Sequence, residues 1–82
     1  MVRVTFYNLL RSRHNLKELE VEASTMRELV SAIQKRYPQV TSEELNQAVL
    51  FINQKKVMHL RRFDERLRDG DKVVFTNFVG GG

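Results

Sequence analysis

The chain has 82 residues, of which 41% are hydrophobic and 29% are charged, with no cysteine and a formal net charge of +4 at pH 7. This length fits one domain with a small core, and the composition is typical of a folded chain. The missing cysteines exclude disulfides, thiolate metal sites and cysteine nucleophiles. No apolar run approaches the roughly 20 residues of a membrane-spanning helix and no signal-peptide pattern is present, so we expect a cytoplasmic protein that does not bind membranes.

The positive charge is distributed unevenly. Residues 1–16 carry three arginines and no acid, residues 17–54 carry four basic and six acidic side chains, and residues 55–82 carry seven basic and four acidic ones. Either this is an ordinary solvated surface, or the basic ends form a docking face for an acidic protein or for RNA. Of these partners, nucleic acid is the less expected.

The first segments of the chain show a strand-like alternation. Val2, Val4 and Phe6 alternate with polar residues, which predicts a half-buried strand with these three side chains in the core. A second alternation over residues 18–23, with three glutamates on its polar side, predicts another strand. The arginine-containing stretch Leu9–Asn15 between them is expected to form a loop, so the two strands are predicted to pair as a hairpin.

A helix is predicted over residues 25–36. Thr25 and Glu28 have the spacing of a capping box, and Pro38 ends the helix because the residue before a proline disfavours helical geometry. A second capping pattern predicts a short helical turn at 42–47. The apolar side chains of the long helix form one stripe, consisting of Met26, Leu29, Val30, Ile33 and Tyr37.

The last third of the chain contains short predicted strands joined by turns. The strands are expected at 49–52, 56–59 and 72–77, with a polar turn at 53–56 and a strong turn signal at 69–71. One helix must then cover one face of one sheet, which is an α+β layer arrangement. The first and last strands are the best candidates for the centre of the sheet.

Three of the four glycines stand at the last three positions, Gly80, Gly81 and Gly82. The simple interpretation is a flexible chain end or a remnant of cloning. A functional interpretation also exists, because a backbone without Cβ atoms can enter a narrow channel and approach a reacting group closely. Such a tail suits a terminal carboxylate that is activated by adenylation and then attacked by a sulfur or amine nucleophile.

Several segments together resemble the MoaD/ThiS family of small ubiquitin-like sulfur carriers, over essentially the whole chain. They are Arg36-Tyr37-Pro38, Ile52-Asn53-Gln54, Leu67 to Val73, and Val79-Gly80-Gly81-Gly82. The resemblance implies the β-grasp fold, a mixed four- to five-stranded sheet with one main helix packed on one face. It also implies a single domain over 1–78 and a flexible tail over 79–82. The long connection between the first two predicted strands looks more like that of the molybdopterin-synthase small subunit than that of the thiazole carrier. The molybdopterin carriers often have prolines just before the tail, however, and this chain has Thr76 to Val79 there.

The resemblance implies a carrier rather than an enzyme. A ubiquitin-activating-enzyme-like adenylyltransferase would adenylate Gly82, and a sulfur donor would convert it to a thiocarboxylate that supplies a synthase or large subunit. No cofactor would be bound by this chain, because ATP and the sulfur donor are used by the partner enzymes. Two alternatives remain open: a ubiquitin-like modifier conjugated to lysines through the same tail, and a β-grasp binding module with an inert tail.

Strand alternation also predicts a partner-binding patch on the open face of the sheet. It consists of Tyr7, Phe51, Val74 and Phe78, unless some of these side chains are tucked under loops. Five basic residues either rim this patch or form a solvated basic face: Lys55, Arg61, Arg62, Arg66 and Arg68. The two histidines, His14 and His59, are expected at the surface, and no metal site is predicted.

Overall fold

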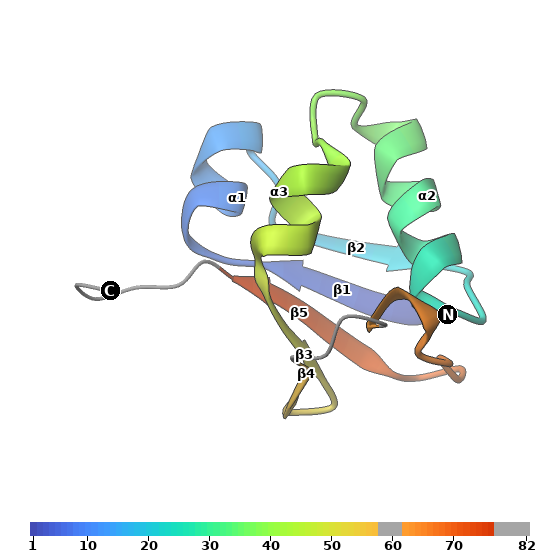
Figure 1. The fold of residues 1–82 in the computed structure, drawn as a ribbon. Coiled ribbons are helices and arrows are strands. Elements are labelled where there is room, and N and C mark those ends of the chain that lie inside the picture. Colours follow the sequence, from blue (N-terminus) through green and yellow to red (C-terminus); the bar gives the residue numbers. More distant parts are fainter. Residues whose placement is uncertain (58–61, 77–82) are drawn as a thin grey trace.

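The computed structural model describes residues 1–57 and 62–76, apart from the side chains of residues 8–10 and 62 (Figure 1). Its strands are β1 (Val2–Phe6), β2 (Glu18–Val21), β3 (Val49–Ile52), β4 (Lys55–Val57) and β5 (Lys72–Thr76). Its helices are α1 (Asn8–His14), α2 (Met26–Arg36), α3 (Ser42–Gln47) and a single 3-10 turn, η1 (Arg62–Asp64).

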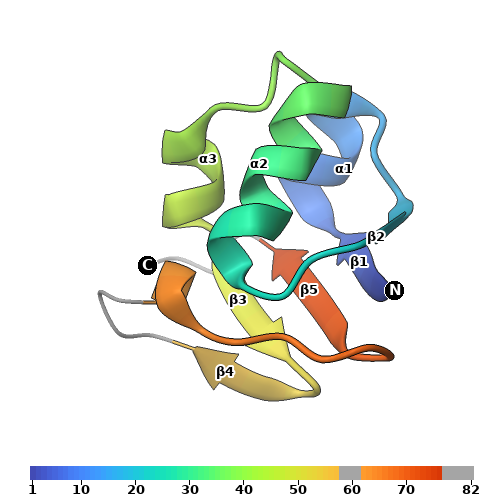
Figure 2. The same ribbon diagram turned by 90° about the vertical axis from the view of Figure 1, so that its right-hand side faces the viewer.

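The five strands form one mixed sheet in the order β2-β1-β5-β3-β4. β1 and β5 run parallel, and all other neighbours are antiparallel. The predicted central position of the first and last strands is confirmed, since β5 is the middle strand and β1 lies beside it. The three helices lie on one side of the sheet and leave its other side open (Figures 1 and 2). This is the predicted β-grasp arrangement.

The expected loop over Leu9–Asn15 is wrong, because this connection contains the helix α1. Seven residues are too few for a clear 3.6-residue pattern, so the helix depends on its ends and on its neighbours. The N–H of Tyr7 donates to the carbonyl of Phe75 (3.0 Å), which ties the start of α1 to β5. Asn15 ends the helix in the left-handed region, with φ 55°.

The two predicted capping sites at the later helices are confirmed, although they differ in detail. Thr41 and Glu44 of α3 form a complete box, in which each side chain accepts from the other residue's backbone N–H. At α2 the Thr25 hydroxyl accepts from the N–H of Glu28 (3.2 Å). The carboxylate of Glu28 instead accepts from the N–H of Ser24 (2.7 Å), so this box is only half formed.

The hairpin between β3 and β4 turns at Asn53 and Gln54, which both have positive φ (50° and 71°). This geometry matches the twist of the flanking strands, and asparagine tolerates it well. The Asn53 side chain accepts from the N–H of Lys72 and donates to the carboxylate of Asp71, both at 2.9 Å. β4 begins one residue earlier than predicted, and positions 58–59 of that prediction lie outside the described residues.

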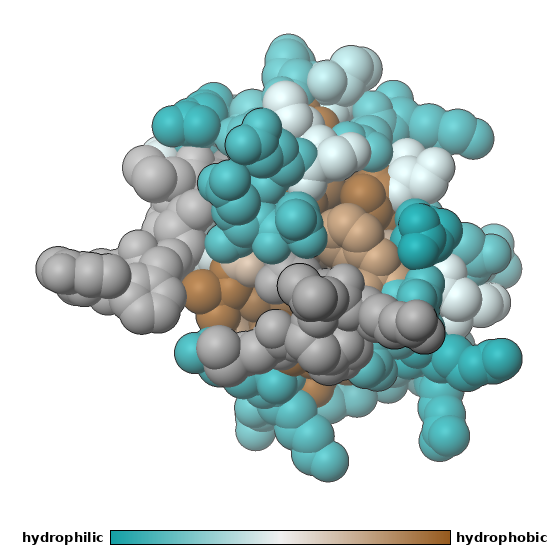
Figure 3. All heavy atoms as spheres, in the orientation of Figure 1, coloured by the Kyte–Doolittle hydropathy of each residue, from teal (hydrophilic) through white to brown (hydrophobic). Residues whose placement is uncertain are grey.

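The core lies between the sheet and the helices. Val2, Val4 and Phe6 are fully buried, as the alternation predicts. Phe6 stacks on Phe75 of the neighbouring strand, with ring centroids 5.7 Å apart. On the side of the molecule that faces the viewer in Figure 1, hydrophilic side chains cover much of the surface and hydrophobic atoms are visible between them (Figure 3). No helix among the described residues is both long and apolar enough to cross a membrane.

Candidate partner-docking face

The open face of the sheet is built by the strand residues that point away from the helices. The pairing of β1, β5 and β3 aligns Thr5, Val74 and Phe51 in one row across the three strands. These three side chains are half-buried, so loops do not cover them fully. Tyr7, which follows β1, is 45% exposed. The apolar centre of this face therefore remains accessible.

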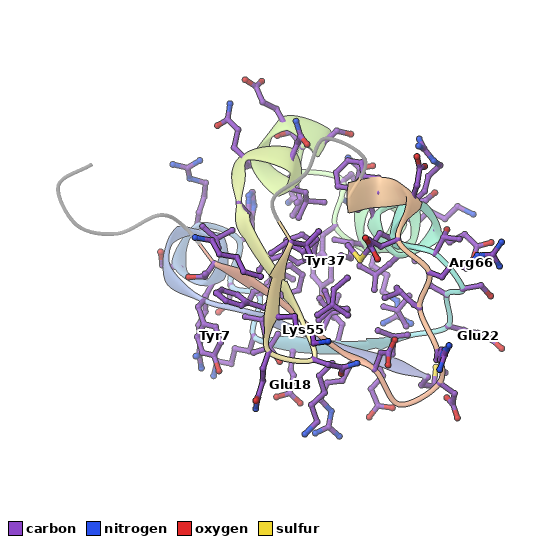
Figure 4. The ribbon with its side chains drawn as sticks, turned by 60° about the horizontal axis from the view of Figure 1, so that its bottom comes forward. Tyr7, Glu18, Glu22, Tyr37, Lys55 and Arg66 are labelled. Atoms are coloured by element: carbon purple, nitrogen blue, oxygen red, sulfur yellow. The ribbon has the colours of Figure 1, made fainter. Side chains whose placement is uncertain are left out.

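Three of the four predicted patch residues lie together. Tyr7, Phe51 and Val74 line a shallow hollow of about 500 Å³. Its other lining residues are Arg3, Thr5, Glu18, Gln54 and Lys72. Figure 4 shows Tyr7 and Glu18 projecting from the same side of the sheet. The fourth predicted residue, Phe78, lies outside the described residues. We call this hollow and its lining residues the docking face.

Charge is arranged asymmetrically around the docking face. On the β2 side, Glu18 and Glu20 lie 3.7 and 3.8 Å from the guanidinium of Arg3. On β5, Lys72 forms no ion pair with any described carboxylate. An apolar centre with one acidic and one basic flank fixes the orientation of a bound partner as well as attracting it.

In the sequence, the tail follows β5, the strand that forms the middle of this face. β5 ends at Thr76, one residue after the carbonyl of Phe75 that accepts from Tyr7. Gly80, Gly81 and Gly82 lie outside the described residues. A partner that covers the docking face therefore contacts the strand that leads into the tail.

The three proposed rim residues whose side chains the structure describes do not border this face. Lys55, Arg66 and Arg68 line a separate hollow, together with residues of β3, β4 and the turn before β5. Lys55 pairs with Ile52 across the hairpin and points to the helix side of the sheet. Arg61 and the side chain of Arg62 are outside the described part of the chain. Register, which the sequence does not reveal, decides this separation.

The expectation of a surface position for His14 is wrong, because only 10% of its side chain is exposed. Its Nε2 lies 3.0 Å from a carboxylate oxygen of Glu44, which also accepts from the guanidinium of Arg13 (3.1 Å). The hydrogen bond from the backbone of Thr41 and those from His14 and Arg13 lower the pKa of Glu44 to about 2. This cluster joins α1 to α3. Within the described residues, no three potential metal ligands gather; His59 lies outside them.

Comparison with solved structures shows the same fold over the whole chain. A chain of the BexX/CysO complex of Amycolatopsis orientalis matches with a TM-score of 0.78 and 23% identity, covering 100% of both chains. Small archaeal modifier protein 1 of Methanosarcina acetivorans matches with a TM-score of 0.76 and 20% identity, over 99% of this chain and 95% of that one. A putative molybdopterin converting factor subunit 1 of Pyrococcus furiosus has a TM-score of 0.74 and 25% identity, over 95% and 97%.

The sequence itself matches a protein-family model. No curated protein matches the chain. The model of the ThiS family matches residues 4–82, which include both the folded part and the three terminal glycines. The chain therefore belongs to the ThiS family, whose members are small ubiquitin-like sulfur carriers that act with partner enzymes and are not catalysts themselves.

Proposed function

We propose that this protein carries sulfur as a thiocarboxylate at Gly82. The observation that carries the proposal is the family match through residue 82, on a fold that leads β5 from an accessible docking face into the tail. A partner enzyme joins the Gly82 carboxylate to AMP and releases pyrophosphate from ATP. A persulfide on a donor protein then displaces AMP and forms an acyl disulfide with Gly82. A second thiol of the donor system attacks the donor-side sulfur of this acyl disulfide, so that the thiocarboxylate leaves and a disulfide forms within the donor system.

The docking face is the surface on which the adenylyltransferase would recognise this carrier. An activating enzyme must hold the folded domain while the tail reaches its ATP site, so it needs a surface next to the tail. Tyr7, Phe51 and Val74 offer aromatic and aliphatic area of the kind that dominates the energy of protein interfaces. Two of the structural neighbours are from complexes with a partner protein, the BexX/CysO pair and the two subunits of a Helicobacter pylori molybdopterin-converting factor.

The ATP site and the sulfur donor belong to partner proteins in this proposal. The sequence contains neither the Gly-x-x-x-x-Gly-Lys-Ser/Thr nor the Gly-x-Gly-x-x-Gly pattern of phosphate-binding loops. As sulfur acceptor we favour a molybdopterin-type precursor. The first connection of the chain is long, and two structural neighbours are named as molybdopterin-converting factors.

The direct test is intact-mass spectrometry. Incubation with the cognate activating enzyme, ATP and a sulfur donor should replace one terminal oxygen by sulfur, and a chain lacking Gly82 should show no exchange. An unchanged mass with a demonstrated cognate enzyme contradicts the proposal.

The docking face is tested by the variant Phe51→Asp. We expect the KM of the activating enzyme for the carrier to rise roughly tenfold or more, with little change in kcat, because the charge must be buried at the interface. Ser31→Asp, which adds the same charge on the exposed side of α2, is the matched control and should leave KM unchanged. An equal rise in KM for both variants would contradict the proposal that this face binds the activating enzyme.

A protein-modifier role is the second candidate, because conjugation to lysines uses the same activated tail and differs only in the nucleophile. One structural neighbour is named a small archaeal modifier protein. This role predicts higher-mass conjugates that carry a glycine remnant and disappear when Gly81 and Gly82 are deleted. Conjugates without any thiocarboxylate would favour it over the sulfur carrier.

A further inference from the structure

A second hollow, of about 560 Å³, lies beside the edge strand β4, and none of its described lining residues belongs to the docking face. Its lining consists of Ile52, Asn53, Lys55, Lys56, Val57, Glu65, Arg66, Arg68 and Asp71. The segment over residues 65–71 runs past the β3–β4 hairpin on the helix side of the sheet (Figure 2). Its volume is within the usual range of ligand-binding clefts. We call it the β4 hollow.

The floor of the β4 hollow is apolar. Ile52 and Val57 are half-buried and pack against the core, on the same side of the sheet as the fully buried Leu50. Both side chains keep part of their surface exposed to solvent. Covering this surface by an apolar side chain of a partner would be favourable, at about 25 cal/mol per Å² buried.

The walls of the β4 hollow carry more positive than negative charge. Lys55, Lys56, Arg66 and Arg68 are exposed, and no ion pair connects them to a carboxylate of the described residues. Figure 4 shows that Lys55 and Arg66 come from different elements. Four cations thus face two carboxylates, Glu65 and Asp71.

Asp71 is already engaged by other groups. Its carboxylate accepts from the Asn53 amide (2.9 Å) and from the N–H of Arg68 (2.8 Å). These hydrogen bonds hold the pKa of Asp71 below its ordinary value, with the Asn53 bond as the larger cause. The charge of Arg68 also lowers this pKa, so Lys55, Lys56 and Arg66 are the cations left for an anionic ligand.

The backbone of β4 is available as well. β4 is the last strand of the sheet and pairs with β3 along one edge only, within the described residues. Side chains of successive strand residues alternate between faces, yet Lys55, Lys56 and Val57 all line the hollow. The hollow therefore follows the edge of the strand itself, where an extended peptide can pair by backbone hydrogen bonds.

We propose that the β4 hollow binds an extended acidic segment of a partner protein, which adds a strand to the edge of β4. An apolar side chain of that segment covers Val57, and its carboxylates meet Lys55, Lys56 and Arg66. The observations favour a peptide over a nucleic acid, because none of the lining residues that the structure describes is aromatic, so this part of the hollow offers no ring on which a base stacks. This interaction does not require the terminal glycines and goes beyond the sulfur-carrier function.

The test is a titration of ¹⁵N-labelled full-length protein, followed by NMR, with the blocked peptide Thr-Val-Glu-Asp-Thr. We expect the largest amide shifts in β4 and at residues 65–68, and weaker binding at higher salt. The neutral peptide Thr-Val-Gln-Asn-Thr should bind roughly tenfold more weakly or not at all. The double variant Lys55→Glu/Arg66→Glu should no longer bind the acidic peptide.

The variant Lys17→Glu/Lys35→Glu makes the same charge change at exposed positions outside the hollow and should bind the acidic peptide like the unchanged protein. Its spectrum and that of the hollow variant also report whether each is folded. Three results would overturn the proposal: shifts centred on the docking face, equal binding of the acidic and neutral peptides, and a uridine decanucleotide that shifts the β4 hollow while the acidic peptide does not.

Discussion

At the scale of single residues, Glu44 takes part in two separate structural arrangements. Its backbone and carboxylate complete the capping box of α3 with Thr41, and its oxygens also meet His14 and Arg13 of α1. The capping half of this arrangement is visible in the sequence as a Thr followed three residues later by Glu. The contacts with α1 are not, because thirty positions separate Glu44 from His14 along the chain.

Glu44→Gln should change how stability depends on pH. The pKa of Glu44 is about 2 in the folded protein against 4.5 without its partners, so the charged carboxylate stabilises the fold fully above about pH 4.5. This contribution is lost as the pH falls through about 2. Denaturant unfolding at a series of pH values should show a smaller loss of stability toward low pH in the variant. Parallel pH curves for both proteins would contradict the prediction.

At the scale of elements, α1 shows how a short helix depends on its surroundings. Basic residues in its last turn, Arg11 and Arg13, suit the negative end of the helix, and Asn15 ends it in the left-handed region. The backbone of Tyr7 binds β5, and Leu16 after the helix is buried. None of these features gives an apolar stripe, and for this reason the sequence pattern favours a loop.

Asn15→Val should destabilise the protein by about 1–2 kcal/mol, because a β-branched side chain disfavours the left-handed conformation. Asn15→Gly is the matched control and should be close to neutral, since glycine adopts φ 55° freely. The free energy of unfolding measures both changes. Amide exchange should show the effect of valine first in α1. A neutral valine variant would mean that the turn after α1 changes its geometry at little cost.

At the scale of the whole molecule, the parallel pair of β1 and β5 joins the two ends of the folded part. The stacked Phe6 and Phe75 rings lie in this pair, and both are fully buried. Few alternative contacts exist in a domain of this size, so these segments must assemble together. We therefore expect unfolding in a single cooperative transition.

The neighbours Phe6 and Tyr7 separate stability from recognition. Phe6→Ala should cost about 3–5 kcal/mol of unfolding free energy, because it removes a stacked ring from the core. Tyr7→Ala should leave stability within about 0.5 kcal/mol, since Tyr7 is exposed. It should instead weaken binding to the activating enzyme, which calorimetric titration measures. Equal stability losses in the two variants would contradict the assignment of opposite roles.

The sequence by itself determines the parts of this protein that depend on local chemistry. The alternation at Val2, Val4 and Phe6, the capping residues of α2 and α3, and the turn at Asn53 predict elements that the structure confirms, because each signal acts over a few residues. The same kind of local pattern places Phe51 and Val74 on the open face, and register brings them into one hollow. The match to the ThiS family also covers the tail, and the thiocarboxylate chemistry of the tail is our proposal.

The tertiary structure alone decides the features that depend on distant neighbours. α1 is a helix because of β5, α3 and Leu16, and the side chain of His14 is mostly covered because Glu44 of α3 lies against it. Lys55 and Arg66 belong to a second hollow because the β3–β4 hairpin points Lys55 to the helix side. The physical reason is the same in each case: free energy from long-range packing and hydrogen bonds exceeds the weak local preferences of these segments.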